Sequence, residues 1–140
     1  MIGHLAILAT TMMAPQTDER SIIDEAYSPG NGRVELCGLD FETFDELLAI
    51  LEDSGEYAEE NSTDEYRVFN GSSPNFRQLV VARSRQTAYP MAYCRLITPN
   101  PDGTSKMESS MHCQGEKDDC SAVFIEFHDH DQAILRAIGA

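Results

Sequence analysis

From Tyr66 onward the sequence is a series of short runs rich in β-branched and aromatic residues, each followed by turn-forming residues. The runs are YRVF (66–69), RQLVVARS (77–84), MAYCRLIT (91–98), KMESSMHC (106–113) and CSAVFIEF (120–127). The segments between them are NGSSPN, RQTAYP, PNPDGTS and QGEKDD. Because turn residues separate consecutive runs, the pattern predicts an antiparallel meander of about four to five strands.

The segment LDFETFDELLAILEDSG (39–55) has the spacing of an amphipathic helix, with Asp40 as N-cap and Gly55 beyond its end. Its apolar positions recur every three or four residues and are Phe41, Phe44, Leu47, Leu48 and Leu51. The opposite face is acidic, and we expect it to bind a partner through Glu42, Asp45, Glu46, Glu52 and Asp53. A second helix is predicted in DHDQAILRAIG (129–139), capped by Asp129 or Asp131.

Strand register predicts how the four cysteines pair. If the last hairpin turns symmetrically about QGEKDD, Cys113 lies opposite Cys120, and the preceding hairpin places Cys94 opposite Ser109. Cys37, just before the first helix, can then meet Cys94 beneath it. The predicted disulfides are therefore Cys113–Cys120 and Cys37–Cys94. The same register predicts one apolar sheet face beneath the first helix, made of Ala92, Cys94, Leu96, Met107, Met111, Cys113, Cys120, Ala122 and Phe124.

Two other interpretations of the cysteines remain open. A zinc site normally uses closely spaced pairs, whereas the spacings here are 57, 19 and 7, so a metal would depend on His112, His128 and His130. Reduced thiols packed in the core are the second alternative. We favour the disulfides and expect no metal and no other cofactor.

The N-terminus has features of an exported protein. Ten mostly apolar, uncharged residues (5–14) precede Pro15, which suits a signal peptide cut after Ala14. The absence of Lys or Arg before this run and the large Met12 argue against cleavage there, and the alternative is an N-terminal core segment. We expect residues 1–14 to be a signal peptide and residues 15–140 to form a single α+β domain, since 140 residues suffice for one core.

The net negative charge is confined to the first half of the chain. The net charge is −14. Residues 15–65 contain 16 acidic side chains against two arginines, whereas residues 66–140 contain eight of each sign. A solvated acidic face that only confers solubility is one interpretation; the other is a surface that repels nucleic acid and attracts cationic partners.

No sequence motif identifies a catalytic reaction. The sequence lacks GxSxG, P-loop, GxGxxG and HExxH patterns. Ser109, Ser110, His112 and Cys113 are close in sequence, but Ser110 and His112 share one face of a strand and point the same way. We therefore expect no catalytic residues, although an enzyme remains open.

Together these features predict a small periplasmic or secreted protein-interaction module, such as an inhibitor, an immunity-type protein or an accessory subunit. Its partner is a protein with a basic surface, and we expect no nucleic acid and no membrane span in the mature chain. An envelope hydrolase or a metal-handling protein is the alternative, and a cytoplasmic nucleic-acid mimic is a weaker one. The second sheet face, which includes Tyr93 and Arg95, is too apolar to be left fully in water. We expect it to be covered by the C-terminal helix, by another protein or by a second copy of the chain in a homodimer.

Overall fold

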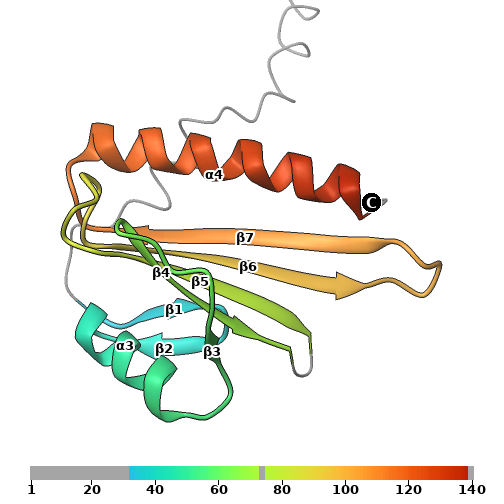
Figure 1. The fold of residues 1–140 in the computed structure, drawn as a ribbon, viewed down its shortest axis with the longest axis horizontal. Helices are drawn as coiled ribbons and strands as arrows, with labels where there is room; N and C mark the ends of the chain where they lie inside the picture. The colour runs from blue at the N-terminus through green and yellow to red at the C-terminus, as the bar shows by residue number, and fades with distance from the viewer. Residues whose placement is uncertain (1–31, 73–74, 139–140) are drawn as a thin grey trace, which may run out of the picture.

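The computed structural model describes residues 32–72 and 75–138, and its centre is an antiparallel sheet of five strands in the order β3-β4-β5-β6-β7. Each strand pairs with its neighbour in sequence, as a meander requires (Figure 1). The α+β class and the meander are therefore confirmed. The strands are β3 (Ala58–Glu59), β4 (Tyr66–Gly71), β5 (Phe76–Ala82), β6 (Met91–Pro99) and β7 (Ser105–Cys113).

A short hairpin and a helix form a layer beneath this sheet. The hairpin consists of β1 (Val34–Leu36) and β2 (Leu39–Phe41), joined by Cys37 and Gly38. Both loop residues have positive φ, 54° for Cys37 and 78° for Gly38. The tight turn that joins the strands of a two-residue hairpin requires positive φ at both positions. Helix α3 (Phe44–Asp53) follows, and Thr43 is its N-cap; the predicted cap, Asp40, lies in β2 instead.

The sheet separates two apolar clusters. On one face, residues of β1, β2 and α3 pack against β4, β5 and β6, and this cluster includes Phe41, Leu47, Leu51, Phe69 and Leu79. On the other face lies the long helix α4 (Lys117–Ala137), whose cluster includes Val80, Tyr93, Met111, Phe124 and Phe127. Figure 1 shows α4 on one side of the sheet and the α3 layer on the other. The C-terminal helix therefore covers the sheet face that includes Tyr93 and Arg95.

The predicted strand 120–127 is wrong, because these residues are the first part of α4. Both periods fit this apolar stretch, but the buried residues recur at helical spacing and include Cys120, Val123, Phe124 and Phe127, while Ala122 is exposed. The helix therefore begins at Lys117 rather than near Asp129, and Asp129 and Asp131 lie inside it.

The predicted β6–β7 register is wrong by one residue. Cys94 lies opposite Ser110, not Ser109, because Asn100 N donates to Thr104 O at 2.7 Å and centres the turn on Asp102. A one-residue shift moves every side chain of one strand to the other face. Ala92 and Cys94 therefore face α3, whereas Met107, Met111 and Cys113 are on the α4 face, so the predicted nine-residue face does not exist.

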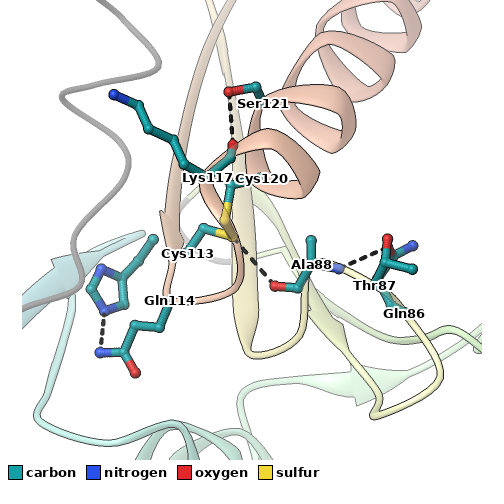
Figure 2. Close-up of a disulfide and its surroundings, with 9 residues drawn as sticks. Gln86, Thr87, Ala88, Cys113, Gln114, Lys117, Cys120 and Ser121 are labelled. Carbon is teal, nitrogen blue, oxygen red and sulfur yellow. Dashed lines mark hydrogen bonds between the residues drawn. A yellow bond between two sulfur atoms is a disulfide. The ribbon is translucent and has the colours of Figure 1, made fainter.

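Both predicted disulfides are nevertheless confirmed, and they lie on opposite faces of the sheet. Cys37–Cys94 joins the β1–β2 turn to β6, with Cα atoms 5.7 Å apart. Cys113–Cys120 joins the end of β7 to the first turn of α4, with Cα atoms 6.1 Å apart (Figure 2). Both separations are within the usual range for a disulfide. Each bridge therefore fixes one covering layer to the sheet.

The chain passes close to itself beside the second bridge. Cys113 Sγ lies 3.4 Å from the carbonyl oxygen of Ala88, in the loop between β5 and β6 (Figure 2). A Cβ at Gly115 would be 2.4 Å from the same oxygen, so only glycine fits there without a backbone shift. The loop 83–90 is thereby packed against the β7–α4 connection.

The predicted signal peptide, residues 1–14, lies outside the described residues. Within the described ranges, no helix is long and apolar enough to cross a membrane.

Candidate protein-interaction surface

The described part of the acidic half, residues 32–65, forms one region of the structure, which we call the acidic layer. This segment contains twelve acidic side chains and one arginine. It comprises β1, β2, α3, the edge strand β3 and the connecting loops. It covers the sheet face opposite α4 and continues to the β3 edge (Figure 1). The asymmetry of charge along the sequence is therefore an asymmetry in space.

Two of the five predicted partner-binding residues are held by Arg33. Its guanidinium lies 3.4 Å from a carboxylate oxygen of Glu42 and 3.3 Å from one of Glu46, and it also pairs with Asp40 at 3.0 Å. All of these side chains are 40–62% exposed. Arg33 therefore organises the N-terminal end of α3 and neutralises part of its charge, at a modest gain in stability because water screens exposed pairs.

A second arginine, Arg67 of β4, crosses from the sheet to α3. It pairs with Glu52 at 3.0 Å and with Glu59 at 2.8 Å, and its side chain is 24% exposed. Hydrogen bonds from Arg67 and from Ser62 lower the pKa of Glu59 to about 2. Both arginines are internal counterions, a role that was not predicted from the sequence. Their positions in the sequence were the signal for this role: Arg33 lies within the acidic segment 32–65, and Arg67 lies just after it.

Asp45 and Asp53 complete the predicted set, and both are exposed at opposite ends of α3. Neither forms an ion pair with another described residue. The structure therefore places four of the five predicted residues on α3 and Glu42 just before its N-cap, and it divides the five into two kinds. Glu42, Glu46 and Glu52 have internal partners, whereas Asp45 and Asp53 present uncompensated charge to solvent.

An open hollow of about 440 Å³ lies beside the N-terminal end of α3. Its lining is Gly32, Glu42, Thr43, Phe44, Asp45, Tyr89, Pro90 and Gln114. Tyr89 is 49% exposed, which is unusual for so large an aromatic side chain. Carboxylates and an exposed aromatic ring in one hollow are the groups that bind an ammonium or a guanidinium.

The three candidate metal-binding histidines are not brought together. His112 is buried on the α3 face, where its ring stacks on Phe44 with centroids 5.4 Å apart and meets Phe41 edge-on. Burial lowers its pKa. His128 and His130 are exposed on α4, beyond the opposite face. Among residues 32–72 and 75–138, no three His, Cys, Asp or Glu side chains are placed to hold a metal ion.

A buried polar cluster joins α4 to the sheet. Asp131 accepts hydrogen bonds from Tyr93 Oη, Arg95 Nε and Ser109 Oγ, the last at 2.6 Å. Arg95 also donates to Gln78 Oε1 at 2.6 Å. Burial, and then the hydrogen bond to Asp131, raise the pKa of Tyr93. Because Asp131 and Arg95 are 3% and 7% exposed, the charged pair at the centre of the cluster is closed to solvent, whereas Ser109 lies at its exposed rim.

The serine and histidine of SSMHC have separate partners. Ser109 donates to Asp131 on the α4 face, whereas His112 lies 3.4 Å from Gln114 Nε2 on the other side of the strand. Their described contacts therefore contain no Ser–His pair of the kind that activates a nucleophile.

No model of a known protein family, no curated protein and no solved structure matches this chain.

Proposed function

We propose that this protein is an exported protein-interaction module whose acidic layer binds a basic surface on a partner protein. The observation that carries the proposal is the concentration of negative charge in one layer: residues 32–65 carry twelve acidic side chains against one arginine, whereas α4 on the other face carries five against two basic ones. A uniformly acidic surface favours no direction of approach, but a one-sided one orients a cationic partner and speeds its association.

The hollow beside α3 supports the same proposal by its shape and chemistry. Glu42 and Asp45 supply carboxylates and Tyr89 supplies an exposed ring. A lysine or arginine side chain of the partner fits such a hollow, because its charged end meets the carboxylates while its stem or guanidinium plane lies on the ring. We expect this to be the anchoring point within the larger acidic layer.

The two disulfides support an extracytoplasmic location. Structural disulfides form and persist in the periplasm or outside the cell, whereas cytoplasmic thiols are kept reduced. Both bridges connect separate elements of the fold. We therefore propose a periplasmic or secreted location.

The test is a pull-down from extracts of the native host, using the full chain and a variant with Asp45→Lys and Asp53→Lys. These two positions are chosen because their carboxylates are exposed and have no described ion pair, so no internal ion pair is lost. We expect the wild-type protein to capture a basic protein at low salt and to release it as salt is raised. The variant should lose this capture.

The matched control carries Glu126→Lys and Asp129→Lys, which change the charge equally but on exposed positions of α4. Capture by this control, together with loss in the acidic-layer variant, supports the proposal. Equal capture by all three proteins, or capture that salt does not affect, would show that the acidic layer serves solubility alone.

A further inference from the structure

The two edges of the five-stranded sheet differ. At one edge, β3 has only two residues and lies within the acidic layer. At the other, β7 has nine residues and pairs with β6 alone among the described strands. Figure 1 shows the β6–β7 hairpin end extending beyond β1, β2 and α3. A long strand with one open side is a template on which another strand can pair.

The hydrogen bonds at both ends of the β6–β7 pair determine which backbone groups point outward. Asn100 N donates to Thr104 O, and Gln114 N donates to Pro90 O. In an antiparallel ladder, hydrogen-bonded pairs alternate with non-bonded ones, so the even-numbered residues of β7 bond to β6. The N–H and C=O groups of Ser105, Met107 and Ser109 therefore point away from β6, toward the open edge.

A row of apolar side chains crosses the sheet and ends at the open edge of β7. Phe76 lies opposite Ile97, and Ile97 lies opposite Met107, so these three side chains form one row on one face. Phe76 is 39% exposed, and Ile97 and Met107 are partly exposed. Ser109, also on the α4 face, is exposed, which indicates that α4 leaves the outer side of β7 open. The row ends at the open edge, where a second strand would continue it.

The charges on either side of Met107 are self-complementary. Lys106 and Glu108 flank it, are exposed and form an ion pair at 2.7 Å. If a second β7 pairs antiparallel with Met107 opposite Met107, each Lys106 lies opposite the other copy's Glu108, and Ser105 lies opposite Ser109. Opposite charges placed directly across a strand pair stabilise it. A pairing centred on Ser109 would instead place Lys106 opposite the buried His112, so the charge pattern selects Met107 as the centre.

We propose that the β7 edge is a self-association site: two copies of this chain pair through Ser105–Ser109, antiparallel about a two-fold axis at Met107. The interface is isologous, as in most homodimers. It joins the two sheets edge to edge and continues the row from Phe76 to Met107 into the second copy. The hairpin end is far from the acidic layer, so the strongest concentration of negative charge stays outside the interface. Because five residues pair on each side, we expect a weak, concentration-dependent dimer.

The test is sedimentation velocity of the full chain over a range of concentrations, with charge variants of the two flanking residues. Lys106→Glu and Glu108→Lys each replace two attractive cross-strand pairs by repulsive ones, and each should raise the dissociation constant about tenfold. The double variant, Lys106→Glu with Glu108→Lys, restores complementarity and should restore dimerisation. An equimolar mixture of the two single variants should form a heterodimer more tightly than either forms a homodimer.

A backbone variant tests the edge independently of charge. Proline at position 107 removes an N–H that points outward and leaves the β6–β7 ladder intact, so Met107→Pro should be folded by circular dichroism and monomeric. A wild-type chain that stays monomeric at millimolar concentration would overturn the proposal. So would a dimer that persists in folded Met107→Pro, or single charge variants that weaken the dimer without rescue in the double variant.

Discussion

Asp131 joins α4 to the sheet through polar contacts. It receives hydrogen bonds from Tyr93, Arg95 and Ser109, and the Asp131 and Arg95 side chains are buried. Removing one member of a buried ion pair leaves the other charged and without its partner, which is far less favourable than losing both. The cluster therefore stabilises one position of α4 over others as long as it is complete.

We predict that Asp131→Asn lowers the free energy of unfolding by about 3 kcal/mol, because Arg95 is left buried without its counter-charge. Asp129→Asn is the matched control, since Asp129 is exposed on the same helix and its change should stay within about 0.5 kcal/mol. Urea unfolding followed by circular dichroism measures both. Equal effects of the two substitutions would show that the cluster contributes no more than a surface carboxylate.

His112 makes stability depend on pH. Burial lowers its pKa in the folded protein, so as the pH falls below about 6.5 the unfolded chain takes up a proton before the folded one does. The stability present above this pH is therefore lost progressively as the pH falls. We predict that wild-type protein loses about 1 kcal/mol more than His112→Phe between pH 7.5 and 5.5, measured by urea unfolding. Identical losses in both proteins would contradict a neutral, buried His112.

At the scale of elements, α3 and the C-terminal helix could be predicted from the sequence, but the first part of α4, before Asp129, could not. The apolar residues of α3 fit only a helical period, but the helix is capped by Thr43, which accepts a hydrogen bond from Glu46 N at 3.1 Å, and not by the predicted Asp40. The stretch from Cys120 to Phe127 alternates like a strand and also fits a helix. Packing on Tyr93 favours the helix, because helical spacing places both Phe124 and Phe127 against the Tyr93 ring.

The two disulfides hold different elements and should contribute unequally. In the chain-entropy model, Cys37–Cys94, with a separation of 57, contributes about 4 kcal/mol, and Cys113–Cys120, with a separation of 7, contributes about 2.5 kcal/mol. We therefore predict that Cys37→Ala with Cys94→Ala destabilises the protein more than Cys113→Ala with Cys120→Ala. Urea unfolding of the two double variants measures the difference, and the reverse order would contradict it.

At the scale of the whole molecule, the disulfide pairs were predictable although the register behind them was not. Cys113 and Cys120 are close enough in sequence to meet across a hairpin or across a strand–helix turn, so the wrong element still yields the right pair. Cys37 reaches Cys94 because the β1–β2 turn lies on the α3 face. The roles of Arg33 and Arg67 could not be predicted, since they depend on tertiary placement.

Two disulfides fasten an acidic layer and a helix to opposite faces of one sheet. Tryptic mapping of natively produced, unreduced protein tests this arrangement most directly, because trypsin separates all four cysteines into the peptides 34–67, 86–95, 107–117 and 118–136. We predict that 34–67 is found linked to 86–95, and 107–117 linked to 118–136. Four free thiols, or a link between 34–67 and either of the last two peptides, would contradict this arrangement and the exported location with it.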